Sequence, residues 1–127
     1  MRLQLQDNLP FTAVTLYYRG QSIEISNVLI DTGSATTILA ADAVHKVQIS
    51  PEPSDTLYTI RGVGGSEVVF SRKVDVLELG ECHLEQFEIE IGGMDYGFSI
   101  NGILGMDFLT RAKAIINLDM VEIEFGK

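Results

Sequence analysis

The sequence predicts an all-β domain with two short helices, in which the strands form a closed or sandwich-like sheet. Short apolar and β-branched runs recur from one end of the chain to the other, and turn-forming residues separate them. Only residues 40–47 and 106–112 have a helical pattern, and the connections are short. The 127 residues, of which 46% are apolar, fit one globular domain over residues 1–127.

Residues 1–47 supply the first hairpin and the first helix. Leu3 and Leu5 alternate with polar neighbours, which is typical of a half-exposed strand, and residues 8–10 end it. The run 11–18 and its return at 22–25 flank a glycine turn and therefore predict a hairpin. The expected strands are 3–5, 11–18, 22–25, 27–30 and 36–39, followed by a helix over 40–47.

The rest of the chain continues the strand pattern. A polar connector over 50–55 precedes a hairpin whose tip is the glycine cluster 62–65. Gly80 and Glu81 indicate a further turn. The expected strands are 56–61, 66–70, 74–79, 84–91, 100–104, 114–118 and 121–125, with the second helix over 106–112.

Asp31 lies where an apolar strand runs into a tight turn. Residues 28–30 are apolar and β-rich, and residues 32–34 are Thr, Gly and Ser. A carboxylate in this position is costly to bury unless it is hydrogen-bonded, and turn amides and hydroxyls can supply those bonds. The pattern fits a reactive acid at the end of a strand, and it also fits a plain turn in which the aspartate only accepts hydrogen bonds from backbone amides.

Charge and cysteine content exclude several classes of protein. A net charge of −9 argues against binding of nucleic acid or an anionic membrane through a basic patch. No apolar run approaches the length of a membrane span, and the first residues lack the apolar core of a signal peptide. Cys82 is the only cysteine, so no disulfide can form within the chain. We therefore expect a cytoplasmic protein.

The residues that most often bind metals are too few and badly spaced here. His45 and His83 lie far apart, and the adjacent pair Cys82 and His83 is poorly suited to joint chelation. We expect neither a metal ion nor another cofactor. A Cys82 nucleophile assisted by a distant histidine is conceivable, but nothing in the pattern favours it.

Three motifs together resemble the aspartic proteases, and the short chain is similar to their single-domain, retropepsin-like branch. Asp31-Thr32-Gly33-Ser34 after an apolar strand resembles the catalytic loop. Gly62-Val63-Gly64-Gly65 resembles the flap tip, the hairpin that closes over substrate. Ile103-Leu104-Gly105, followed by 106–109, resembles the strand, glycine and helix that support the catalytic loop. The resemblance implies a closed, β-barrel-like retropepsin-type fold.

The resemblance also implies a role for each residue of the loop. Asp31 would be catalytic, and Thr32 would hydrogen-bond across a dimer. Gly33 would present its backbone to the substrate, and Ser34 would donate a hydrogen bond to the outer oxygen of Asp31. Relatives often have a further aspartate where this chain has Ala35, so the substrate contacts of that acid are missing here. Thr36 is a possible substitute.

One Asp-Thr-Gly motif per chain implies that two copies build one active site. An aspartic endopeptidase of this type is a homodimer that cleaves an extended peptide with a water held between two Asp31 carboxylates. The terminal strands, 3–5 and 121–125, are expected to join the copies, with Glu122 and Glu124 facing solvent. Asp107 is explained by its place at the start of a helix. The alternative function is a non-catalytic dimerisation or peptide-binding domain with the same fold.

Overall fold

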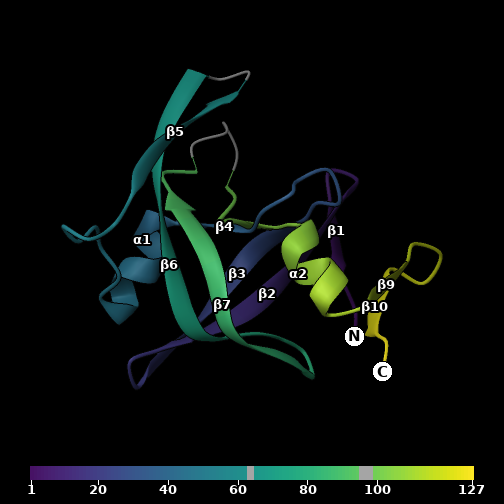
Figure 1. Cartoon of the computed structure of the whole chain (residues 1–127). Coiled ribbons are helices and arrows are strands. Elements are labelled where there is room, and N and C mark those ends of the chain that lie inside the picture. Colours follow the sequence, from purple (N-terminus) through teal and green to yellow (C-terminus); the bar gives the residue numbers. More distant parts are fainter. Residues whose placement is uncertain (63–64, 95–98) are drawn as a thin grey trace.

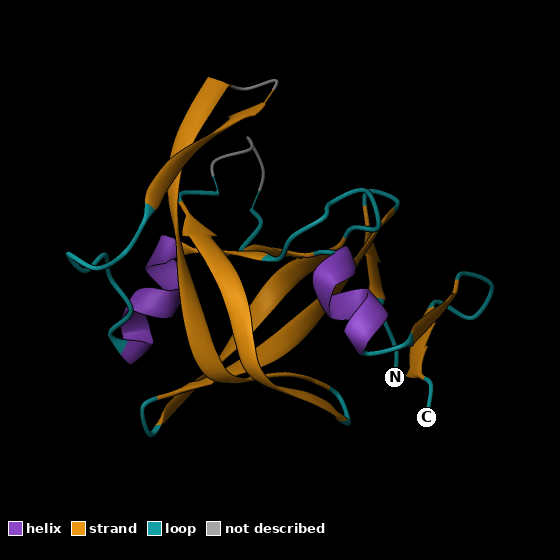
Figure 2. Cartoon of the chain, in the orientation of Figure 1, coloured by secondary structure: helices purple, strands orange, loops and turns teal. Residues whose placement is uncertain are grey.

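The computed structural model of the chain describes residues 1–62, 65–94 and 99–127, and the side chains of 60–62 and 65–67 are left aside. Over these residues strands dominate, and two short α-helices and one 3₁₀ turn flank them (Figures 1 and 2). The strands are β1 (Gln4–Gln6), β2 (Leu9–Tyr18), β3 (Gln21–Ile30), β4 (Ile38–Ala40), β5 (Leu57–Gly62), β6 (Gly65–Leu79), β7 (Cys82–Gly92), β8 (Gly102–Leu104), β9 (Ala114–Asn117) and β10 (Glu122–Phe125). The helices are α1 (Ala41–Val44) and α2 (Met106–Arg111), and the 3₁₀ turn η1 spans His45–Val47.

Six strands form a closed ring. Their hydrogen-bonded order is β2, β3, β8, β4, β7 and β6, and β6 pairs back onto β2. The pairs β3–β8 and β4–β7 are parallel, and the other pairs of the ring are antiparallel. Figure 2 shows these strands wrapping around a common interior. The expected all-β, barrel-like fold is therefore confirmed.

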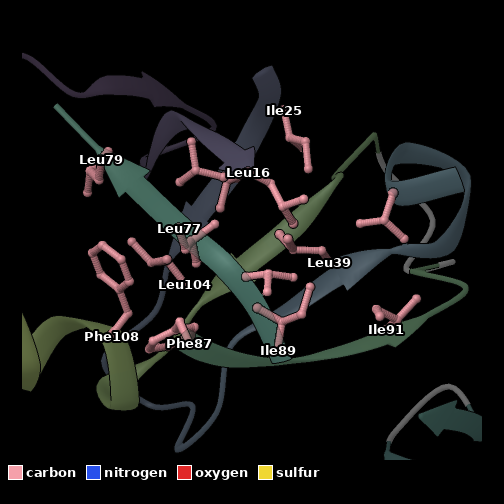
Figure 3. Close-up of a cluster of buried hydrophobic side chains, with 14 of the residues drawn as sticks. Leu16, Ile25, Leu39, Leu77, Leu79, Phe87, Ile89, Ile91, Leu104 and Phe108 are labelled. Atoms are coloured by element: carbon pink, nitrogen blue, oxygen red, sulfur yellow. The ribbon is translucent and has the colours of Figure 1, made fainter. Parts of the chain in front are cut away.

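The interior of the ring is an apolar cluster to which most strands contribute (Figure 3). Phe108 of α2 meets Phe87 of β7 in an edge-to-face contact with ring centroids 5.6 Å apart, which attaches the second helix to the sheet. The largest side chains of the cluster with almost no exposure are Leu16, Leu39, Ile49, Leu77, Leu79, Phe87, Ile89, Ile91, Leu104, Phe108 and Ile123.

A second, smaller apolar cluster lies on the opposite side of β4 and β8. Because side chains alternate along a strand, Leu39 and Leu104 belong to the interior, whereas Ile38 and Ile103 belong to the second cluster. The other buried members are Phe11, Ala40, Val69, Met94 and Ile100, with Leu29 and Tyr58 packed against them. The sheet next to Asp31 thus has two apolar faces, and only one of them faces the interior of the ring.

Several expected boundaries were wrong in informative ways. Strands expected at 66–70 and 74–79 are one strand, β6, because residues 71–73 between them stay paired with β7. The polar Arg72 fits there since it is buried in an ion pair with Asp55 at 2.6 Å. The expected helix 40–47 is the short α1 followed by η1, which ends at Gln48 in the left-handed conformation (φ 65°). The break expected at 8–10 is a tight turn at Asp7 and Asn8, both with positive φ, and β2 starts directly after it.

The predicted flap tip is only partly within the described residues. Gly62 and Gly65 are the last register pair of the β5–β6 hairpin, which rises beyond the ring in Figure 1. Val63 and Gly64 lie outside the described residues. The β5–β6 hairpin starts where Leu57 pairs with Phe70, and its place in the chain agrees with the hairpin predicted around residues 62–65.

The two ends of the chain lie together (Figure 1). The amino group of Met1 donates to the Ile123 carbonyl at 2.8 Å, and the Leu3 amide donates to the Val121 carbonyl at 2.9 Å. These residues therefore extend the small β9–β10 sheet by a third segment.

Among the helices of the described ranges, not one combines the length and the apolar character that a membrane crossing requires.

Candidate active site

Asp31 continues β3 beyond its last residue. Its amide donates to the Leu104 carbonyl at 3.0 Å, which extends the parallel ladder between β3 and β8. Since Val28 and Ile30 are interior residues, alternation places Asp31 on the other face, with Leu29. The carboxylate of Asp31 is accordingly half-buried, next to the second apolar cluster instead of inside the ring.

The turn after Asp31 holds its carboxylate with a backbone amide. The Gly33 amide donates to Asp31 Oδ1 at 2.8 Å, and the Ser34 amide donates to the Asp31 carbonyl at 3.2 Å. A Cβ on Gly33 would lie 3.2 Å from Oδ1, so glycine permits this close approach. Thr32 and Gly33 are exposed at the tip of the turn. The carboxylate is therefore fixed in direction while one side remains open.

The hydroxyl of Ser34 does not support Asp31 as predicted. Ser34 Oγ donates to the Thr36 carbonyl at 2.8 Å, so the expected hydrogen bond from Ser34 to Asp31 is wrong in this structure. The backbone of Ser34 already closes the turn onto Asp31, and its side chain is directed to the chain that leaves the turn. Ser34 thus fixes the shape of the loop, and the Gly33 amide is the group that contacts the carboxylate.

The motif Ile103-Leu104-Gly105 packs directly under the loop formed by residues 31–37. Leu104 accepts the Asp31 amide, and the two amides that follow Gly105 donate to the carbonyls of Ser34 (2.8 Å) and Ala35 (3.2 Å). A Cβ at Gly105 would lie 2.9 Å from the Ser34 carbonyl oxygen and closer still to Thr36. The predicted association of this motif with the Asp31 loop is therefore present, and it requires glycine at position 105.

A pair of polar residues, the buried Thr37 and the half-buried Asp107, closes the loop from below. Thr37 has no exposed surface, and its hydroxyl donates to Asp107 Oδ1 at 2.7 Å and accepts the Gly105 amide at 3.0 Å. The Thr37 amide donates to Asp107 Oδ2 at 3.1 Å. From the sequence, the helix dipole alone explained Asp107, and Thr37 had no assigned role. The Asp107 carboxylate in fact anchors the end of the loop.

A second acid, Glu90 at the end of β7, contacts the loop from the other side. The hydroxyls of Thr36 and Tyr58 donate to its two carboxylate oxygens, and Tyr58 also shares a hydrogen bond of 2.8 Å with Ser71. Burial raises the pKa of Tyr58, and its hydrogen bond to Glu90 raises it further, so Tyr58 stays a donor over the range of ordinary assays. No motif in the sequence indicated Glu90, because its partners are 54 and 32 residues away.

The competing nucleophile, Cys82, is in a poor setting for catalysis. Burial raises the pKa of the Cys82 thiol, and the nearby charge of Glu81 raises it further. His83 Nδ1 lies 2.7 Å from a carboxylate oxygen of Glu78, so the adjacent imidazole is already engaged by that acid. Within residues 1–62, 65–94 and 99–127, no three His, Cys, Asp or Glu side chains gather as a set of metal ligands.

Comparisons with known proteins show the family and the fold of the chain. Residues 14–108 match the family model described as "Aspartyl protease". The fold is similar to that of EIAV protease complexed with the inhibitor HBY-793, with a TM-score of 0.63 and 23% identity over 88% of this chain and 95% of that one. It is also similar to a retropepsin-like aspartic protease from Rickettsia conorii, with a TM-score of 0.65 and 16% identity over 92% of each chain. No curated protein matches. The matched segment includes the Asp31 turn and Gly105, and the chain belongs to the aspartyl protease family.

Proposed function

We propose that this chain is one half of a homodimeric aspartic endopeptidase. The observation that carries the proposal is the placement of Asp31, which the Gly33 amide holds at the end of β3 with one side open. Asp107 of α2, which lies next to the loop, is occupied by Thr37, so it is not a second catalytic carboxylate. A second Asp31 from another copy is the natural partner.

Two Asp31 carboxylates facing each other would perform the chemistry of peptide hydrolysis. Like charges at short distance cannot both ionise, so the pair would retain one proton. The ionised member would take a proton from the attacking water, and the protonated member would donate its proton to the carbonyl oxygen of the substrate. The Gly33 amide would keep Asp31 Oδ1 in position through both proton transfers.

The second apolar cluster supports binding of an extended peptide. Leu29 and Ile103, which are half-buried, lie on the same face as Asp31, where substrate side chains would cover them. The β5–β6 hairpin carries Tyr58 to the same cluster. A strand-like peptide between this face and the hairpin would gain backbone hydrogen bonds from β pairing and selectivity from alternate side chains. The inhibitor bound to EIAV protease is in keeping with a binding site of this kind in the fold.

The hairpin formed by β9 and β10 is the best surface for the second copy. Three apolar residues on it are strongly exposed: Ile115 (56%), Leu118 (68%) and Met120 (51%). The outer edge of β10 is covered by residues 1–3 of the same chain, whereas β9 has β10 as its only strand partner in the described part of the chain. A symmetric contact through β9 and this apolar tip would cover both the edge and the exposed side chains.

Cleavage of a denatured protein mixture tests the proposal directly. The wild-type chain should release new peptides, and a statine-type inhibitor should stop the release. Asp31→Asn, which is nearly isosteric, should reduce turnover to background while its circular dichroism spectrum and dimerisation remain unchanged. Retained turnover by purified Asp31→Asn would remove Asp31 from the mechanism. Peptide binding without cleavage by the wild type would instead identify a peptide-binding domain.

A further inference from the structure

We propose that Glu90 determines substrate specificity by binding a cationic side chain, Lys or Arg, of the peptide. The inference rests on the proposed function, because it assigns a substrate class to the same site. Glu90 belongs to neither the Asp31 turn nor the motif that supports it. Glu90 is half-buried, and its carboxylate accepts a hydrogen bond from the Thr36 hydroxyl, while its amide donates to the Thr37 carbonyl at 2.9 Å.

The sheet register places Glu90 in one row with residues beside Asp31. Leu29 pairs with Ile103, Ile103 pairs with Ile38, and Ile38 pairs with Glu90. Ile89 and Ile91 face the interior of the ring, so Glu90 lies on the opposite face, which is the face of Leu29 and Asp31. The strand of Asp31 and the strand of Glu90 are three steps apart in the sheet, or about 14 Å at the usual strand spacing.

The separation of the Asp31 and Glu90 strands equals the length of a few residues of an extended peptide. An extended chain advances about 3.3 Å per residue, so a peptide cleaved at Asp31 would bring a side chain to Glu90 about three or four residues from the scissile bond. A long side chain such as Lys or Arg can shorten that span by reaching toward the carboxylate. The half-buried Leu29 and Ile103, which lie between the two acids, would contact the apolar side chains of the intervening peptide residues.

The contacts of Glu90 orient its carboxylate without neutralising it. Thr36 and Tyr58 are neutral hydroxyl donors, and each uses one of the roughly four acceptor positions of a carboxylate. Two positions remain for a cationic donor, and hydrogen bonds between charged groups are stronger than neutral ones. Glu88 is exposed on the same face of β7 and adds negative charge there.

Two basic residues of β6, Arg72 and Lys73, lie near Glu90 in the sheet but face other groups. Arg72 of β6 is directed to the other side of the sheet, where it binds Asp55 at 2.6 Å and the Ser50 carbonyl at 3.0 Å. Lys73 stands opposite Glu88 in the register, whereas the residue opposite Glu90 is Ser71. Within the described side chains, Glu90 forms no ion pair with Lys, Arg or His. The substrate is therefore the cation that we assign to it.

Paired peptides provide the test. The two peptides of a pair are identical except at one position, which is Lys in one and norleucine in the other. Norleucine has a similar length and apolar surface but no charge. The varied position is moved in turn through the four residues on each side of the scissile bond. At one or more positions, the wild type should cleave the Lys peptide with a kcat/KM higher by about three- to tenfold. Glu90→Gln should lose this preference, and Glu90→Lys should prefer a Glu peptide at the same position. Glu85→Gln, at an exposed position on the same strand, is the control and should keep the Lys preference.

The outcomes separate specificity from structural support and from the proposed function. An equal decrease for Lys and norleucine peptides in Glu90→Gln would show that Glu90 only supports the loop, and it would overturn the inference. Cleavage by the wild type without a Lys preference at any position would also overturn it and leave the proposed function standing. If the wild type cleaves nothing, fluorescence anisotropy with the same peptides still decides. Tighter binding of a Lys peptide that is lost in Glu90→Gln supports the inference, and equal or absent binding overturns it.

Discussion

Gly105 packs against Thr36 so closely that a Cβ at position 105 would lie 2.6 Å from the Thr36 carbonyl carbon. The opposing atoms are backbone, so they cannot move aside as a side chain could. Gly105→Ala should therefore displace the loop that carries Asp31 and lower the free energy of unfolding by about 1–3 kcal/mol, as overpacking does. Chemical denaturation measures the stability, and peptide turnover should decrease further than the unfolded fraction explains.

Gly102→Ala is the matched comparison. There the closest atom to a new Cβ is a methyl carbon of Leu39 at 2.6 Å, and the nearest backbone atom, the Ile38 carbonyl oxygen, is 3.1 Å away. A methyl group at the end of a side chain can shift, so we expect a smaller loss of stability and little loss of turnover. A larger effect at 102 than at 105 would contradict the idea that the loop depends on the contact with Gly105.

Thr37→Val should destabilise the protein although the side chains have nearly the same shape. The substitution removes the hydroxyl that joins Asp107 to the Gly105 amide, and it leaves that buried amide without its partner. The half-buried Asp107 carboxylate keeps its hydrogen bonds from the amides of residues 37 and 108. The expected cost is about 1–3 kcal/mol in the free energy of unfolding. Thr37→Ser keeps the hydroxyl and should recover part of the loss, whereas Thr36→Val, at an exposed position, should change stability much less. Thermal unfolding of the three variants in one buffer ranks them, and equal values for all three would remove the role of the Thr37 hydroxyl.

The local patterns of the sequence predicted the fold and the Asp31 turn. A run of apolar residues ending in Asp31-Thr32-Gly33 specifies a strand and a turn without reference to the rest of the chain, and Gly105 follows another such run. Both predictions depend on neighbours in the sequence. The ring of strands also follows, because many short alternating runs leave few ways to bury their apolar faces.

The acids that fix the loop could not be predicted in the same way. Asp107 contacts Thr37 across 70 residues, and Glu90 contacts Thr36 across 54. A polar residue within a strand or at a helix start is usually solvent-exposed, so its sequence pattern does not distinguish a structural acid from a surface one. Arg72 was missed for the same reason, since burial of a charge depends on a partner that only the tertiary structure provides.

The buried ion pair between Arg72 and Asp55 should make stability depend on pH. The hydrogen bond from Arg72 holds the pKa of the Asp55 carboxyl below its ordinary value, and the Glu52 amide lowers it further. A lowered pKa in the folded state stabilises the protein above the unfolded pKa, about 3.9, and the contribution is lost as the pH falls through the folded value. Asp55→Asn should therefore be less stable than the wild type at pH 7, and the difference should shrink below about pH 4.

Glu52→Gln is the control for this ion pair. Glu52 also approaches Arg72, at 3.5 Å, but its side chain is 40% exposed, and exposed pairs contribute little. Its stability should follow that of the wild type at both pH values. Urea denaturation at pH 7 and pH 3.5 provides the comparison, and a constant difference between Asp55→Asn and the wild type would contradict the titration of Asp55 as its cause.

Assembly through the β9–β10 hairpin should control activity. If each chain supplies one Asp31, specific activity must rise with protein concentration, and moderate salt should help because each chain carries a net charge of −9 that opposes association. Leu118→Asp puts a charge on the most exposed apolar residue of the hairpin and should weaken the dimer and the activity together. Ser22→Asp adds the same charge at an exposed position in another hairpin, at the start of β3, and should change neither beyond the general charge effect. Removal of residues 121–127 is a less specific test, because β10 also holds Met1 and Leu3. Sedimentation velocity at assay concentration measures the oligomeric state directly. A fully active monomer would contradict an active site built from two chains.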